Sequence, residues 1–241
     1  EVKNMKTSTI LSSSKRYILR HKETFFEFFL LFAFSMLLFL VDVQVFDASE
    51  VPLYILMSGF LSAIVVFPRK AISKHFDLSS SYRFWYMGFL LSIILTLGSG
   101  LLGFYALFPI IGSLDYKRNR KTFTGIKSSE VSNKEKSYIS LLMLMIFIGI
   151  GLLLILAAQR YAYRALYQSG MFLVALSFVS ILPYHKLEGL PLFYHNVFLY
   201  GIITIFLLLI LISAAINLIW AAYLFVAFVL ISLFSKELKL L

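Results

Sequence analysis

The sequence has 241 residues, of which 60% are hydrophobic, 17% are aromatic and only 14% are charged. A water-soluble domain of this length could not bury so much apolar surface in one core, so the composition excludes a soluble globular protein and predicts an integral membrane protein. The net charge is +10 and there is no cysteine, which excludes disulfides, thiolate nucleophiles and cysteine-ligated zinc or iron–sulfur sites.

The apolar segments predict an all-α fold, a polytopic bundle of transmembrane helices. A helix needs roughly 20 residues to cross a bilayer, and the sequence lacks the alternating segments typical of barrel strands. The predicted segments are 25–40, 51–67, 85–111, 139–158, 171–182, 197–214 and 218–234. The last two form one apolar run that would be about 57 Å long as a single helix, so we expect a turn between Ser213 and Asn217.

The segments that flank the bundle are short. Residues 1–24 form a basic arm, 25–235 a single transmembrane domain and 236–241 a C-terminal tail. No cleavage-site pattern separates the basic arm from the first apolar segment, so we expect this segment to be retained as an anchor.

The charged residues predict the topology. Basic residues are concentrated in the N-terminal arm and in the loops after the second and third segments, whereas the first loop carries only acidic residues. By the positive-inside rule, the first loop is external, the other three regions are cytoplasmic, and both termini are cytoplasmic. Because basic loops then flank segment 85–111 on the same side, we expect this segment to enter and return, bending at Gly98–Ser99–Gly100 and leaving about six crossings. The alternative is a straight crossing with a basic loop that breaks the rule.

Arg160 and Arg164 are the basic residues that this topology leaves outside. Together with neighbouring tyrosines they are predicted to contact lipid headgroups at the interface, and a more specific lipid or quinone site is the alternative. Glu27, near the start of the first segment, is expected to lie at the other interface. Basic residues placed in this way indicate membrane lipids rather than nucleic acid as partners, and we expect the plasma membrane of a prokaryote.

The segment Ser180-Ile-Leu-Pro-Tyr-His-Lys-Leu-Glu-Gly189 resembles the N-x-x-P-x-x-x-L-D-G motif of the site-2 proteases, which are intramembrane zinc metalloproteases. Pro183, Leu187 and Gly189 are identical to the motif, and Glu188 stands in the place of the aspartate. The resemblance implies that Glu188 occupies the position of the family's third zinc ligand.

A second stretch resembles the same family, in particular its small archaeal and bacterial members. The sequence Arg69-Lys-Ala-Ile-Ser-Lys-His-Phe-Asp77, followed by a polar stretch to Trp85 and an apolar segment with glycines, is similar to the region after the family's H-E-x-x-H helix. The resemblance covers residues 61–200, somewhat more than half of the chain.

The sequence departs from this family at the metal site. A zinc protease needs two histidines at i and i+4 on one helix face and a glutamate as general base. The corresponding pentad here is Val65-Val66-Phe67-Pro68-Arg69, which has neither a ligand nor a base. The resemblance therefore implies a family member without its catalytic residues, in which Arg69 and Glu188 could form an ion pair where the metal would lie; an interfacial carboxylate paired with Lys186 is the alternative.

Other metal-binding side chains occur in the sequence without the spacing of a strong motif. A relocated zinc site could use His75, His185, Glu188 and His195. The alternative is that the histidines are ordinary residues at helix ends near the headgroups.

These observations predict a non-catalytic membrane protein, an accessory or helix-binding subunit of a membrane complex, with no cofactor. The first alternative is an active intramembrane metalloprotease with an atypical zinc site. A small transporter ranks last, because the apolar segments carry few charges and show no inverted repeat.

Overall fold

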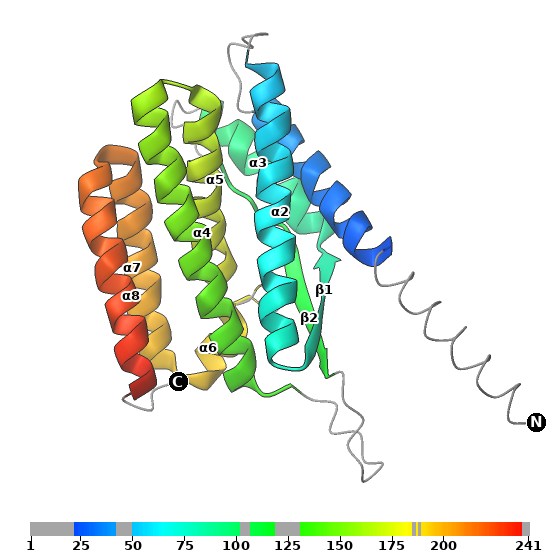
Figure 1. Ribbon diagram of the computed structural model, residues 1–241, viewed down its shortest axis with the longest axis vertical. Coiled ribbons are helices and arrows are strands. Elements are labelled where there is room, and N and C mark those ends of the chain that lie inside the picture. Colours follow the sequence, from blue (N-terminus) through cyan, green and yellow to red (C-terminus); the bar gives the residue numbers. More distant parts are fainter. Residues whose placement is uncertain are drawn as a thin grey trace, which may run out of the picture.

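The computed structural model describes residues 22–41, 50–101, 107–118, 131–184, 187 and 189–237. In these residues helices dominate, with one pair of short strands (Figure 1). In chain order the elements are a helix at Lys22–Val41, α2 (Val51–His75), β1 (Leu78–Phe84), α3 (Tyr86–Leu101), β2 (Gly112–Arg118), α4 (Asn133–Tyr161), α5 (Arg164–Ile181), α6 (Gly189–His195), α7 (Val197–Ile216) and α8 (Leu218–Glu237).

The predicted all-α transmembrane bundle is confirmed. Five of the described helices are long and apolar enough to cross a membrane: Lys22–Val41, α2, α4, α5 and α7. The apolar part of α8, Leu218–Leu230, packs beside α7 as the second arm of a helical hairpin (Figure 1). The Lys22–Val41 helix, α2, α4 and α5 share one hydrophobic core, and α4 to α8 share a second, so that α4 and α5 join the two halves.

Several helices extend beyond their predicted apolar segments. α2 continues to His75 rather than ending at Phe67, and α4 begins at Asn133 rather than at Ile139. The polar start of α4 is stabilised by a capping box, in which the Ser132 side chain accepts from the Glu135 backbone and the Glu135 side chain accepts from the Ser132 backbone. Hydropathy locates the membrane-embedded part of a helix, whereas its ends are set by such polar caps.

The turn predicted within the last apolar run is confirmed. α7 ends at Ile216 and α8 begins at Leu218, with the extended residue Asn217 between them. The Asn217 side-chain oxygen accepts a hydrogen bond of 3.0 Å from the backbone N–H of Ile219 and so caps the start of α8.

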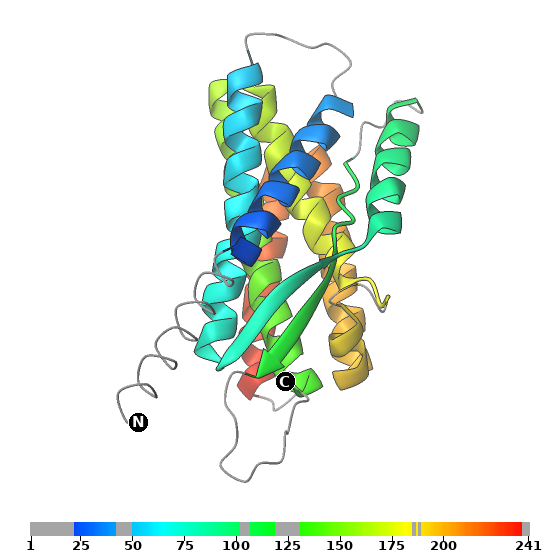
Figure 2. The same ribbon diagram turned by 90° about the vertical axis from the view of Figure 1, so that its right-hand side faces the viewer.

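Segment 85–111 leaves the sheet and returns to it, as the charge pattern predicts. β1 and β2 pair in antiparallel register, so Phe84 and Gly112, at the two ends of this segment, lie opposite each other. Figure 2 shows α3 rising from one strand and the chain descending to the other. The predicted bend at Gly98–Gly100 is wrong, because these residues are helical and α3 continues to Leu101. Two glycines cost about 2 kcal/mol in helix propensity, which is too little to end a helix that is packed on one side.

The returning part of the hairpin, residues 107–111, is extended, and side chains of α3 satisfy its backbone. Ser92 Oγ accepts a hydrogen bond of 2.7 Å from the Ile110 N–H, and Thr96 Oγ1 accepts one of 3.2 Å from the Phe108 N–H. Ser92 and Thr96 lie on one face of α3, four residues apart, and both are buried. Unpaired amides are costly in a membrane, so these hydroxyls allow an extended segment to lie inside the bundle.

Ser92→Ala should therefore lower the free energy of unfolding by about 1–3 kcal/mol, since the buried Ile110 N–H loses its 2.7 Å acceptor and keeps only the 3.0 Å hydrogen bond to the nearby Phe108 carbonyl. Ser177→Ala is the matched control: Ser177 is equally buried in a helix, but its hydroxyl donates only to the Leu173 carbonyl of its own helix. Denaturant titration in detergent micelles measures both variants. Equal losses would contradict the role assigned to Ser92.

Candidate functional site

The pentad Val65–Arg69, which the sequence resemblance aligns with the protease metal motif, lies within α2. Val65 and Val66 are buried in the core shared by the Lys22–Val41 helix, α2, α4 and α5. Arg69 is one helical turn after Val65, on the same face, and is only 2% exposed. The pentad thus presents two packed valines and one buried, positively charged arginine.

The guanidinium of Arg69 lies between aromatic rings from two other elements. Its Cζ atom is 5.2 Å from the ring centroid of Tyr82 in β1 and 5.8 Å from that of Phe147 in α4. Both distances fit cation–π interactions, which gain strength away from water. Arg69 therefore links α2 to the sheet and to α4. These side chains do not fit a zinc ion, because none of them is a ligand and the arginine would repel a cation.

The second segment of the resemblance, residues 180–189, begins in the last turn of α5, and the structure describes all of it except residues 185, 186 and 188. Leu187 is buried with Val179 and with Ile110 of the returning hairpin segment. The next hairpin residue, Ile111, belongs to the core cluster that contains Val65 and Val66. The hairpin thus shares an apolar cluster with each of the two segments. Glu188, the position of the third zinc ligand in the family, lies outside the described residues.

Gly189 begins α6 and is packed against the end of α5. A Cβ atom at this position would overlap the carbonyl group of Ile181 and come within 2.8 Å of the Leu182 carbonyl oxygen. The glycine of the motif is therefore required for space.

The structure does not assemble the alternative zinc site from the residues that it describes. His75 ends α2, where its ring meets Phe76 edge on at 5.7 Å, and His195 ends α6. His185 and Glu188 lie outside the described part. Within that part, no group of three or more histidine, aspartate or glutamate side chains is placed to hold a metal ion.

Arg160 and Arg164 lie on either side of the turn that joins α4 to α5, and both are exposed. Ala162, between them, adopts a left-handed conformation with φ 58°. This turn is at the opposite end of the bundle from the start of α4 (Figure 1). Headgroup contact by the two arginines stays a prediction.

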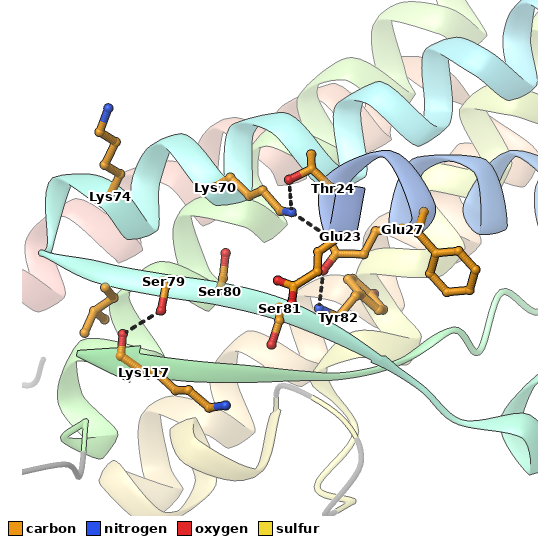
Figure 3. A pocket seen from close by; sticks show the side chains of 12 residues that line it. Glu23, Thr24, Glu27, Lys70, Lys74, Ser79, Ser80, Ser81, Tyr82 and Lys117 are labelled. Atoms are coloured by element: carbon orange, nitrogen blue, oxygen red, sulfur yellow. Dashed lines mark hydrogen bonds and ion pairs between the residues drawn. The ribbon is translucent and has the colours of Figure 1, made fainter. Parts of the chain in front are cut away.

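Sequence reasoning missed a pocket of about 540 Å³ between the Lys22–Val41 helix, the last turns of α2 and the two strands (Figure 3). Its wall combines both signs of charge with several hydroxyls and an exposed aromatic ring. The lining residues are Glu23, Thr24, Phe26, Glu27, Lys70, Lys74, Leu78, Ser79, Ser80, Ser81, Tyr82 and Lys117.

One side of the pocket is fixed by an ion pair. Lys70 Nζ lies 2.7 Å from Glu27 Oε2 and donates a 2.7 Å hydrogen bond to Thr24 Oγ1. The other carboxylate oxygen of Glu27 accepts a 3.0 Å hydrogen bond from the backbone N–H of Tyr82 in β1. Glu27 is buried, so the prediction of an interfacial carboxylate missed its contacts with α2 and β1. Glu27 lies within a predicted helix and Lys70 lies just after another, but two residues 43 positions apart in the sequence give no rule by which their ion pair could be predicted.

Comparison with known proteins gives no matching family model, no matching curated protein and no matching solved structure.

Proposed function

We propose that this chain is a non-catalytic membrane protein on a site-2-protease-like scaffold, and that it acts by binding other transmembrane segments as an accessory subunit of a membrane complex. The observation that carries the proposal is Arg69. It is buried on α2 at the position of the second histidine ligand, with its guanidinium held by Tyr82 and Phe147. The resemblance thus aligns a buried, positively charged side chain with a position that holds a metal ligand in the family.

The hairpin lies between the two segments on which the resemblance is based. Its returning residues Ile110 and Ile111 belong to the apolar clusters that contain Leu187 and the pair Val65 and Val66, respectively. Fold-level likeness is an associational argument for function, so the proposal of a non-catalytic protein is based on the residues of the site and not on the scaffold.

The surface that we propose for partner helices is the outer face of α3. Its large apolar side chains are exposed in a row along the helix, whereas the opposite face is buried on residues 107–111. The exposed members are Tyr86, Met87, Leu90, Leu91, Ile94, Leu97 and Leu101. In a bilayer such a face contacts either lipid or another transmembrane segment.

Metal content and crosslinking test the proposal together. We expect protein purified in mild detergent without chelators to contain far less than one zinc per chain. A photo-crosslinking residue at Ile94 should capture a membrane protein, whereas one at Leu156 of α4, which is similarly exposed, should capture only lipid. One zinc per chain that is lost in His195→Ala would instead support the metalloprotease with an atypical site.

A further inference from the structure

We propose that the pocket between the Lys22–Val41 helix, α2 and β1 binds the phosphate group of a phospholipid headgroup. This inference is independent of the proposed function, because it uses none of the protease motif positions.

The charges of the pocket favour an anionic ligand. Glu27 is already neutralised by Lys70, so the charges left on the wall are those of Glu23, Lys74 and Lys117. The side chains of these three residues are exposed, and the two lysines have no ion pair within the described residues. Figure 3 places the lysines on opposite sides of β1, Lys74 on α2 and Lys117 on β2. The two lysine ammonium groups outnumber the one free carboxylate, so the wall has a net positive charge. The flexible ammonium groups can therefore donate hydrogen bonds to the oxygens of a phosphate group.

Hydroxyl groups complete the phosphate-binding chemistry. Ser79, Ser80 and Ser81 follow one another along β1 and all line the pocket. Ser80 Oγ is buried and has no hydrogen-bond partner within the described part of the chain, which is an unfavourable state that a ligand oxygen would relieve. The volume of about 540 Å³ is larger than a phosphate needs and leaves room for the rest of a headgroup.

The position of the pocket identifies a lipid as the source of the phosphate. Glu23, Thr24 and Phe26 belong to the first turns of a helix that is long and apolar enough to cross a membrane, so the pocket lies where this helix reaches the headgroup layer. Phe26 lines the pocket and is 64% exposed, and its neighbour Phe25 is 72% exposed. Such aromatic side chains beside a polar pocket would contact the upper part of the acyl chains.

Native mass spectrometry of the full chain in detergent tests the proposal with three probes. Phosphatidylglycerol carries phosphate and acyl chains, diacylglycerol with the same chains lacks phosphate, and glycerol phosphate lacks chains. We expect phosphatidylglycerol to bind at least about tenfold more tightly than diacylglycerol, since one charge-assisted contact alone contributes about that factor. It should also bind more tightly than glycerol phosphate, which lacks the apolar contacts of the acyl chains. Glycerol phosphate binding as tightly as the lipid would overturn the lipid source, and no preference for phosphate would overturn the site.

Two charge-matched double variants locate the binding. Lys74→Gln/Lys117→Gln should abolish the preference for phosphatidylglycerol over diacylglycerol. Lys134→Gln/Lys136→Gln removes the same charge from the start of α4, outside the pocket, and should retain the preference. Equal losses in both would show a general attraction of the basic end of the molecule and would overturn the proposal.

A second pair of variants makes the test independent of the lysines. Phe26→Ala should weaken phosphatidylglycerol binding and leave glycerol phosphate binding unchanged. Phe25→Ala, which removes an equally exposed ring that does not line the pocket, should change neither. Identical behaviour of the two variants would contradict the assigned path of the acyl chains.

Discussion

Gly189→Ala is expected to prevent stable folding, with a loss of at least about 3 kcal/mol in the free energy of unfolding, the upper end of the usual cost of overpacking. The new methyl group would overlap the carbonyl group of Ile181 at the end of α5. Backbone atoms on both sides form this contact, so a side-chain rotation cannot relieve it. Either α6 or the last turn of α5 must move, and Leu187 would then lose its packing on Ile110 and Val179.

Gly201→Ala is the matched control for this prediction. Gly201 lies in α7, and a Cβ atom there meets no heavy atom within 4 Å. Alanine is favoured over glycine in a helix by about 1 kcal/mol, so this variant should be as stable as the parent or slightly more stable. The yield of monodisperse protein and its thermal unfolding in detergent distinguish the two variants. A normally folded Gly189→Ala protein would contradict the close approach of α6 to α5.

The spans and the hairpin could be predicted because they depend on the hydropathy of single segments and on the charges of single loops. Hydropathy alone locates the helices that can cross a membrane, and one polar residue, Asn217, marks the break between α7 and α8. The return of segment 85–111 followed from the charges of the loops on either side of it. The bend itself was misplaced because glycine lowers helix propensity only slightly, and the packing of α3 on residues 107–111 outweighs that effect.

The strands could not be predicted in the same way. β1 contains three serines in a row, which neither alternate with apolar residues nor favour a strand. It is a strand because it pairs with β2, whose sequence begins 28 residues after the end of β1. The pocket has the same origin, since its walls come from four elements that no local pattern connects.

The close packing of α4 and α5 was partly predictable. Gly151 is a small residue within the predicted segment 139–158, where another helix can approach closely, and the structure places it against Gly170 of α5. A Cβ atom on Gly170 would lie 2.6 Å from the Gly151 carbonyl oxygen. The partner could not be identified, because a small residue shows that a close approach is possible without showing which helix makes it.

Substitutions of Arg69 and Glu188 are expected to have coupled effects on the free energy of unfolding. This coupling is the sharpest test of how the chain differs from a metalloprotease. The resemblance assigns both residues to former ligand positions, and Arg69 is buried on α2 among aromatic rings. If the two charges pair, Arg69→Met leaves a carboxylate without its countercharge, and Glu188→Gln leaves a buried guanidinium. Each single variant should lose about 3–5 kcal/mol in the free energy of unfolding.

The double variant Arg69→Met/Glu188→Gln should then lose less than the sum of the two single variants, with a coupling energy of about 1–3 kcal/mol. Denaturant titration of the four proteins in mixed micelles measures this energy. The cycle Arg69→Met with Glu50→Gln is the control, because Glu50 lies at the opposite end of α2, accepts from the backbone N–H of Ala165 and should show little coupling to Arg69. Additive losses for Arg69 and Glu188 would refute the ion pair, and the buried guanidinium would then be held by Tyr82, Phe147 and other groups around it.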